Sequence, residues 1–506
     1  MSLMSAALWA ALILNIATAN ARWLRVAQRE HYEQGRTTAM ALIWCRTRPE
    51  NWLVYVLALI SLVIGLTQSI ATLIGLILLI LWPLGLSPKS TTASVAWTPR
   101  FRRLVGLLLL VELVLAVTAV QPKRAALLSL LVVPLTDLSL TFLGPLEKKL
   151  SRHFVKDAQV KLRKIRPTIV AITGSYGKTS TKLYVAHLLS ASHNTVSSPA
   201  SFNNLMGLSR AVNDRLIPGT EVFVAEMGTY GRGEIRELCK IFPPSIAAIT
   251  TIGEAHLERM KNRATIVAAK SEVTERAGTV VLNVDVSELD DLAKMLAAHK
   301  QVIRCSSSPS QDSNVRVEDS AGEWQVTVEG RQLARIPAPA AGHPINLSIA
   351  IGIALALDVS PDSLLGRLND LPGASHRAET QRTSDGVVII DDTYNSNPQG
   401  AFKALGAALA AVGGQGRVFT VTPGMVELGQ EQNARNEAFA AAATAQPNMT
   451  LAVTGRTNRK ALETGVTKPG ALRRYPNRQA ATNAIMCEAR AGDVVFYEND
   501  LPDHYP

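Results

Sequence analysis

Cysteine and aromatic residues are scarce in this chain, and their placement argues against several kinds of site. Four cysteines occur in 506 residues, with the separations of neither a metal-ligand cluster nor a redox pair. We therefore expect reduced thiols without a structural role. Aromatic residues make up 5% of the chain, and no stripe alternates them with basic residues. The net charge of +11 is therefore a weak argument for nucleic-acid binding.

The first apolar run, residues 2–19, lacks both marks of a secretory signal. No basic residue precedes it, and no clear small-residue cleavage site stands before Arg22. We interpret it as a retained helix. Further apolar runs, each long enough to cross a hydrocarbon core, occupy residues 52–66, 70–86, 104–120 and 125–143. The sequence therefore predicts a bundle of about five transmembrane helices over residues 1–147.

Basic residues are concentrated in alternate connections between these runs. Six arginines lie between the first two runs, and four basic residues, Lys89, Arg100, Arg102 and Arg103, precede the fourth run. The remaining connections carry only Lys123 and Arg124, whereas Lys148, Lys149, Arg152 and Lys156 follow the last run. The positive-inside rule then places everything after Leu150 in the cytoplasm, as part of a multi-pass protein of the cell membrane. Two carboxylates within the runs, Glu112 and Asp137, are expected to face the bundle interior, as substrate contacts or as protonated structural groups.

Beyond residue 160, short apolar strands alternate with helical patterns. Strands are expected at 168–173, 222–226, 246–251 and 279–283, and again at 387–391, 417–422, 451–454 and 493–497. This alternation is typical of an α/β fold whose mostly parallel sheets are covered on both faces. We expect a central nucleotide-binding domain over residues 160–342 and a Rossmann-like C-terminal domain over residues 343–506.

A glycine turn joins the first of these strands to a helix start. The sequence from Val170 to Lys182 is Val-Ala-Ile-Thr-Gly-Ser-Tyr-Gly-Lys-Thr-Ser-Thr-Lys, a short form of phosphate-binding loop. Its glycines let backbone N–H groups converge on phosphate oxygens, its lysine adds positive charge, and its first threonine can bind Mg²⁺. The expected nucleotide contacts are Gly174, Ser175, Tyr176, Gly177, Lys178, Thr179 and Ser180. The alternative is a chance glycine turn.

Two later strand ends carry candidate metal ligands. Glu226 ends an apolar strand and is the candidate for a Mg²⁺ anchor beside Thr179, the alternative being a capping or ion-paired glutamate. His256 follows another strand of the same sheet. Imidazole is a common metal ligand, so this position favours a ligand over a structural histidine.

Seven short motifs follow one another between residues 165 and 495. They are Thr173-Gly-Ser-Tyr-Gly-Lys-Thr-Ser180, Ser201-Phe-Asn-Asn-Leu-Met-Gly207, Glu226-Met-Gly228, Ala255-His-Leu-Glu258, Ala269-Lys270, Asp391-Asp-Thr-Tyr-Asn-Ser-Asn-Pro398 and Gly424-Met-Val-Glu-Leu-Gly429. Together they resemble the motifs of the ATP-dependent Mur ligases, which build the peptide of peptidoglycan precursors.

The resemblance implies roles for particular residues. Lys270 corresponds to a lysine that CO₂ carbamylates into a ligand for a second Mg²⁺, with His256 as its companion; without the resemblance, Lys270 would be interpreted as an exposed helix lysine. Asn346 corresponds to the adenine contact and Asp392 to the ribose contact. The implied catalytic residues are Lys178, Lys270, His256 and Asn204, and the implied metal ligands are Thr179, Glu226, His256 and Lys270. Asn203 would lie near the reacting phosphate.

The implied reaction is the ATP-dependent formation of an amide between an acceptor carboxylate and the amine of an amino acid or dipeptide. The acceptor would be a muramyl-peptide-like compound. In place of the family's UDP-sugar-binding domain stands the predicted membrane bundle, which either binds a lipid-linked acceptor or only anchors the enzyme. The acidic stretch 497–505 suits a donor ammonium group better than a donor carboxylate.

The sequence does not exclude several other functions. A polymer ligase of the poly-γ-glutamate type would use the same loop. An ATP-driven transporter is a weaker hypothesis, because the chain lacks a Leu-Ser-Gly-Gly-Gln signature. An inactive scaffold, or another ATP-binding membrane protein that is not a ligase, is the remaining alternative.

Overall fold

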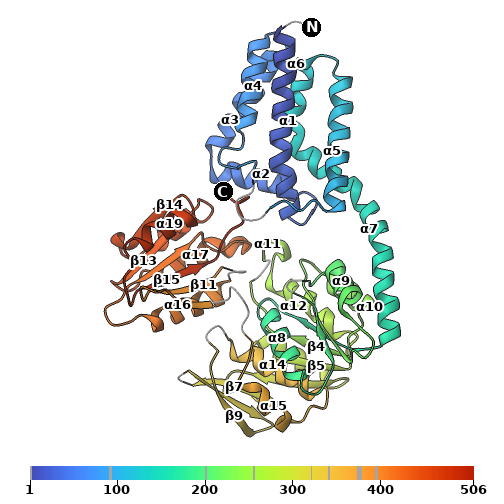
Figure 1. The fold of residues 1–506 in the computed structure, drawn as a ribbon, viewed down its shortest axis with the longest axis vertical. Coiled ribbons are helices and arrows are strands. Elements are labelled where there is room, and N and C mark those ends of the chain that lie inside the picture. The colour runs from blue at the N-terminus through green and yellow to red at the C-terminus, as the bar shows by residue number, and fades with distance from the viewer. Residues whose placement is uncertain are drawn as a thin grey trace. The chain divides into compact units, whose positions relative to one another are not determined.

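The computed structural model describes residues 3–89, 94–199, 202–254, 257–320, 322–339, 342–372, 379–393 and 397–506 (Figure 1). The chain divides into two compact units. One, here the helical unit, comprises Met1–Leu150 together with Gly455–Thr457 and Leu501–Pro506. The other, here the α/β unit, comprises Ser151–Thr454 and Asn458–Asp500. His256 lies outside the described residues.

Helices α1 to α7 form the helical unit, and α7 continues into the α/β unit. They are α1 (Leu3–Arg29), α2 (Arg36–Thr47), α3 (Glu50–Gly65), α4 (Ser69–Leu81), α5 (Pro99–Thr118), α6 (Pro122–Ala125), a 3₁₀ turn (Ala126–Leu131) and α7 (Val132–Ile165). Among the described residues, α1 and the helical run Pro122–Ile165 are long and apolar enough to cross a membrane. A third span results if α2 and α3, bent by 111° at their junction, count as one.

The expectation of about five spans is therefore not confirmed. A helix needs about 20 residues to cross a hydrocarbon core of about 30 Å, whereas α3 has 16 residues and α4 has 13. The apolar run at 52–66 is no longer than α3, and the run at 70–86 is longer than α4. In particular, the run 70–86 includes the irregular segment that follows Leu81.

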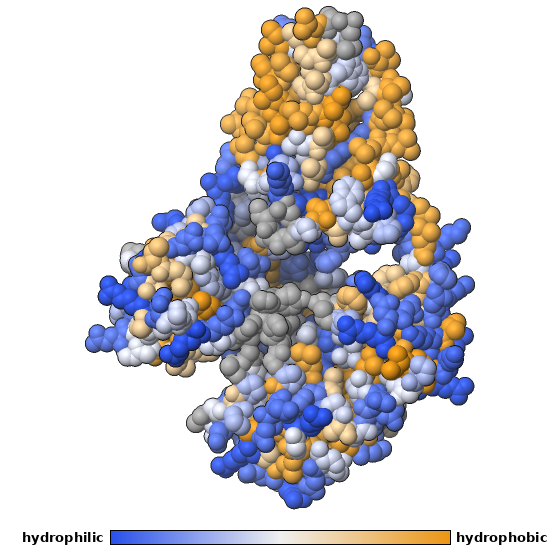
Figure 2. Space-filling view, viewed as in Figure 1, coloured by the Kyte–Doolittle hydropathy of each residue, from blue (hydrophilic) through white to orange (hydrophobic). Residues whose placement is uncertain are grey.

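Large apolar side chains cover the outside of the helical unit (Figure 2). Leu53 and Val63 on α3 are 61% and 54% exposed, and Leu113 and Val117 on α5 are 61% and 67% exposed. A contiguous apolar surface of this kind is unusual for a protein surrounded by water.

Both carboxylates in the apolar runs accept hydrogen bonds from other residues of the helical unit. Glu112 is buried and its Oε2 accepts a hydrogen bond of 2.8 Å from Asn20 Nδ2 of α1. Asp137 Oδ2 accepts bonds from the backbone N–H of Thr38 at 2.8 Å and from its hydroxyl at 2.6 Å. Thr38 lies in the first turn of α2, whose backbone N–H groups have no intrahelical acceptor. Asp137 therefore caps α2.

The first sheet of the α/β unit has the strand order β2-β3-β1-β4-β5-β6-β7-β8-β9. Its strands are β1 (Thr168–Thr173), β2 (Thr195–Ser197), β3 (Val222–Glu226), β4 (Ile246–Ile249), β5 (Thr279–Asn283), β6 (Gln301–Ser306), β7 (Val315–Ser320), β8 (Glu323–Val328) and β9 (Arg331–Pro337). Pairing is parallel from β2 through β7 and antiparallel from β7 to β9.

Helices cover both faces of this sheet. They are α8 (Lys178–Leu189), α9 (Leu205–Arg215), α10 (Glu234–Ile241), α11 (Leu257–Met260), α12 (Arg263–Ser271), α13 (Ser287–Leu296), α14 (Pro344–Leu355) and α15 (Pro361–Leu368), with a 3₁₀ turn at Glu272–Thr274. Successive strand residues point to opposite faces. Ile169 and Ala171 of β1 join the core that contains α9 and α12, whereas Val170 and Ile172 join the core that contains α8 and α14.

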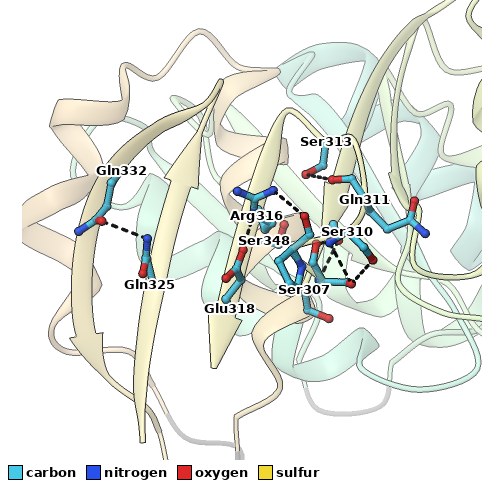
Figure 3. A network of polar contacts seen from close by, with 12 residues as sticks. Ser307, Ser310, Gln311, Ser313, Arg316, Glu318, Gln325, Gln332 and Ser348 are labelled. Atoms are coloured by element: carbon cyan, nitrogen blue, oxygen red, sulfur yellow. Dashed lines mark hydrogen bonds and ion pairs between the residues drawn. The ribbon is translucent and has the colours of Figure 1, made fainter. Parts of the chain in front are cut away.

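Polar side chains bond to one another in the connection between β6 and β7 and on the strands that follow it (Figure 3). The hydroxyls of Ser308 and Ser310 lie 2.9 Å apart, and Arg316 forms an ion pair with Glu318. Gln325 Nε2 donates to Gln332 Oε1 at 3.0 Å across β8 and β9.

The second sheet has the order β10-β11-β15-β12-β13-β14, parallel except between β10 and β11. Its strands are β10 (Glu379–Arg382), β11 (Val388–Asp392), β12 (Val418–Thr422), β13 (Met449–Thr454), β14 (Leu472–Tyr475) and β15 (Val494–Glu498). Its helices are α16 (Pro398–Ala411), α17 (Gln432–Ala442), α18 (Arg459–Gly465) and α19 (Arg478–Met486), with 3₁₀ turns at Gly429–Glu431 and Pro469–Ala471. The predicted α/β class is confirmed.

Helix α14 packs on the first sheet. A Cβ atom added to Gly352 would lie 2.8 Å from Cys305 Sγ and 2.9 Å from Val281 Cγ1, so the helix touches β5 and β6 closely. The sequence analysis assigned this helix to the domain that contains the second sheet. The domain limits 1–147, 160–342 and 343–506 stay predictions.

Candidate nucleotide and metal site

The glycine turn after β1 needs both of its glycines. Gly174 and Gly177 have φ values of 152° and 81°, in the region that side chains disfavour. A Cβ at Gly174 would lie 1.9 Å from Thr250 Oγ1, and one at Gly177 would lie 2.3 Å from Asn346 Oδ1. The turn therefore fits only as glycine, and it leads directly into the N-terminus of α8, where backbone N–H groups favour an anion.

The loop is fastened to the end of β4. The backbone N–H of Ser175 donates to Thr251 O at 2.8 Å, and Ser175 Oγ bonds to the N–H and the carbonyl of Gly253 at 2.9 and 3.1 Å. Thr250 Oγ1 donates to Tyr176 O. Lys178 Nζ donates to the carbonyl oxygen of Gly174 at 2.7 Å, so its charge lies over the loop.

Glu226 lies beside this loop because β3 is the neighbour of β1, with Glu226 in register with Ile172. The carboxylate is buried. Its Oε2 accepts a bond of 3.1 Å from Thr179 Oγ1, and its Oε1 accepts a weaker one of 3.4 Å from Asn203 Nδ2. The structure thus brings together the hydroxyl and the carboxylate proposed as Mg²⁺ ligands. Hydroxyl and carboxylate oxygens are ligands that Mg²⁺ prefers, so these residues fit the ion.

Lys182 is a member of the site that the sequence analysis missed. It lies one helical turn after Lys178 on α8, is buried, and forms an ion pair of 2.9 Å with Glu226 Oε2. Its spacing of four residues from Lys178 places both lysines on one face of the helix. That spacing was visible in the sequence, but nothing local showed that this face is buried.

Lys270 on α12 is also buried. Burial, and secondarily the charge of Lys178, holds the pKa of Lys270 well below its usual range. The interpretation of Lys270 as an exposed helix lysine is therefore wrong.

The other residues predicted for the site lie on several helices and on a strand of the second sheet. Asn204 caps α9, its Oδ1 accepting from Gly207 N at 2.9 Å. Asn346, in the first turn of α14, lies against Gly177. Ser180 lies in the first turn of α8. Asp392 ends β11 in the second sheet, where its carbonyl accepts from Asn499 N at 3.3 Å. Within the described residues, no group of three or more His, Cys, Asp or Glu side chains forms a metal cluster.

A phosphate loop at the carboxyl end of a parallel strand, a carboxylate on the next strand and a second open sheet define a P-loop nucleotide-binding protein of the α/β class. Residues 172–354 match the family model described as the Mur ligase middle domain, and residues 376–497 match that of the Mur ligase glutamate ligase domain. The chain belongs to the Mur ligase family.

Named relatives agree with this assignment. UDP-N-acetylmuramoyl-tripeptide–D-alanyl-D-alanine ligase of Mycobacterium leprae is 30% identical over 367 residues, which cover 65% of this chain and 70% of the relative. The ligase of the same name from Mycobacterium tuberculosis (strain ATCC 25618 / H37Rv) is 32% identical over 294 residues, 53% of this chain and 55% of the relative. The chain thus spans about half the length of this second relative.

Solved structures share the fold. MurF from Acinetobacter baumannii superposes with a TM-score of 0.60 at 22% identity, covering 68% of this chain and 77% of that one. MurF ligase from Thermotoga maritima, solved in complex with ADP, gives a TM-score of 0.59 at 23% identity, covering 69% and 80%.

Proposed function

We propose that this chain is a membrane-bound, ATP-dependent amide ligase of peptidoglycan precursor synthesis. The observation that carries the proposal is the convergence of the glycine loop, Thr179, Glu226 and buried Lys270 in a Mur ligase fold. A chance glycine turn would not have a hydroxyl, a carboxylate and buried lysines arranged around it.

In the proposed reaction, an oxygen of the acceptor carboxylate attacks the γ-phosphorus of ATP, and ADP leaves. The amine nitrogen of the donor then attacks the carbonyl carbon of the acyl phosphate, phosphate leaves, and the nitrogen loses a proton. Lys178 and the N–H groups at the start of α8 neutralise charge on the phosphates. Thr179 and Glu226 would hold Mg²⁺, which supplies further neutralisation.

Lys270 suits the proposed carbamylation. Only a neutral amine attacks CO₂, and burial keeps this amine neutral at a pH where an exposed lysine is charged. The product is an anion, which would balance the neighbouring positive charge of Lys178. His256 remains the proposed companion ligand. Asn346 would contact the adenine and Asp392 the ribose, and Asn204 would lie near the acceptor.

The apolar surface of the helical unit supports a membrane location, with α1 and the run Pro122–Ile165 as spans and the α/β unit in the cytoplasm. The helical unit stands where other family members have a domain for the UDP-sugar. We therefore propose a lipid-linked muramyl-peptide acceptor, with an amino acid or dipeptide as donor.

The test is ATP-dependent phosphate release by the detergent-solubilised protein. Lipid-linked and UDP-linked muramyl peptides are compared, each with candidate amino acids and dipeptides, and a Lys178→Met variant serves as the control for turnover. Release only with the lipid-linked acceptor supports the proposal, and release only with the UDP form reduces the helical unit to an anchor. Release with neither, but with a glutamate polymer, establishes the polymer ligase instead.

A further inference from the structure

Two lysines of α8 lie close to the phosphate loop, but their ammonium groups contact different partners. Lys178 Nζ donates to the loop carbonyls of Gly174 at 2.7 Å and of Ser175 at 3.3 Å. Lys182 Nζ, one helical turn further on, donates to Glu226 Oε2 at 2.9 Å. Lys178 is thus directed to the loop, whereas Lys182 is directed to a proposed metal ligand.

The pair of Lys182 and Glu226 is buried between α8 and β3. Their side chains are 2% and 3% exposed. Taking a single charge out of water is costly, and an oppositely charged group in contact offsets much of that cost. The ammonium of Lys182 is therefore a counter-ion of Glu226.

Both carboxylate oxygens of Glu226 accept hydrogen bonds. Oε2 is shared by Lys182 and by Thr179 Oγ1, which lies 3.1 Å away, and Oε1 accepts a longer bond of 3.4 Å from Asn203 Nδ2. Mg²⁺ binds proteins through the lone pairs of carboxylate oxygens, together with other oxygen ligands and water. The ammonium and the metal ion are therefore competitors for the negative charge of one side chain.

We propose that Lys182 is a built-in counter-ion that weakens the binding of a divalent cation at Glu226 until nucleotide phosphates add negative charge. The inference rests on the proposed function, in which Thr179 and Glu226 hold Mg²⁺. A divalent cation that joins the neutral pair alone leaves an excess of buried positive charge, whereas phosphates that arrive with the ion compensate it. Lys182 is a positioning residue, because it acts on the ion through Glu226.

The experiment measures the binding of Mn²⁺, in place of Mg²⁺, to the full chain in detergent by the enhancement of water proton relaxation. Lys182→Met removes the charge and keeps an unbranched side chain. Lys182→Gln removes the charge but keeps an N–H donor for Glu226, so it serves if the methionine variant does not fold. Lys164→Met, at an exposed position of α7, is the matched control for the loss of one positive charge. Each protein is titrated alone and with ADP.

Without nucleotide, both Lys182 variants should bind Mn²⁺ at least about tenfold more tightly than the wild type and the Lys164→Met control, because a positive charge beside the carboxylate is gone. Mn²⁺ should also raise the melting temperature of these variants more than that of the wild type. The double variant Lys182→Met/Glu226→Gln should lose the tight binding, which assigns the gain to Glu226. With ADP, the wild type should form a complex of protein, Mn²⁺ and nucleotide.

Equal or weaker binding of Mn²⁺ by the Lys182 variants would overturn the proposal, because it would show that the lysine only holds Glu226 in place. Tight binding by the nucleotide-free wild type would overturn it as well. If Mn²⁺ binds none of the proteins, even with ADP, the metal site itself is refuted and the inference with it. These measurements require no turnover, so failure of the proposed ligase reaction is a separate result.

Discussion

The α/β unit and the helical unit bury charge in opposite ways. Around the phosphate loop, Lys182 pairs with the carboxylate of Glu226, Lys178 donates to the loop carbonyl of Gly174, and buried Lys270 feels the charge of Lys178. In the helical unit, buried polar groups bond instead to the protein's own backbone and side chains. Arg22, for example, donates to the carbonyls of Ile80, Trp82 and Leu86 at 2.7 to 3.0 Å.

This difference separates a binding site from a structural framework. Burying Lys270 beside the charge of Lys178 is costly, and the phosphates of a nucleotide would neutralise Lys178. A guanidinium that caps carbonyls or a carboxylate that caps a helix already has its partners. Substitutions should therefore affect activity at the first site and stability at the second.

Lys178→Met should give the largest effect, because it removes the charge nearest the phosphates. We expect ATP-dependent phosphate release to fall by about 10²- to 10³-fold, the range for losing one preorganised stabilising group, with a melting temperature close to that of the wild type. Lys164→Met, at an exposed position of α7, is the control. A Lys178→Met protein with normal turnover would contradict the assignment of the loop.

Lys270→Met should lower activity and raise stability. The folded state keeps this amine neutral while the unfolded chain binds a proton, so below the unfolded pKa the lysine destabilises the fold, and stability rises as pH increases. We expect the variant to melt about 2 to 4 °C higher near pH 7 and to lose most of the rise in melting temperature between pH 7 and pH 9. An equally steep pH dependence in both proteins would refute the burial argument.

Glu112 tests whether a buried carboxyl of the helical unit has a structural role. Glu112→Ala leaves the buried amide of Asn20 without its acceptor and should cost about 1 to 3 kcal/mol in detergent. Glu112→Gln keeps an oxygen acceptor and should cost less than half as much. Thermal unfolding of both variants distinguishes a structural carboxyl from one whose charge is required, since the latter would make the two substitutions equally harmful.

Asp137→Ala should give the smallest effect. It removes the cap of α2 and should destabilise the helical unit by about 0.5 to 2 kcal/mol. Asp157→Ala, at a half-exposed position of α7, should change stability by less than the error of the measurement. Phosphate release at saturating substrate should be unaffected by either.

The sequence predicts local features well and burial poorly. The strands at 168–173, 222–226 and 279–283 agree with the structure because each is an apolar run with a polar end. The Thr179 and Glu226 pair was predicted because Glu226 ends an apolar strand, and the structure places that strand beside β1. Lys182 was missed because a lysine on a helix is usually solvated. Lys270 was selected only through the family resemblance, since its burial depends on contacts distant in sequence.

The helical unit was harder to predict for a different reason. Hydropathy measures the length of an apolar run, and α4 ends at Leu81 although its run continues to residue 86. The packing of residues 455–457 and 501–506 within the helical unit has no local signature at all. Their partners, such as Arg25 and Glu30, are hundreds of residues away in the chain.

The close approach of Gly177 to Asn346 has a kinetic consequence. The phosphate loop and the proposed adenine contact belong to helices packed on one face of the first sheet. In the proposed complex, both ends of ATP can therefore be captured before the second sheet takes part. The association rate of nucleotide should then be governed by the first sheet alone, while contacts from the second sheet lengthen the residence time.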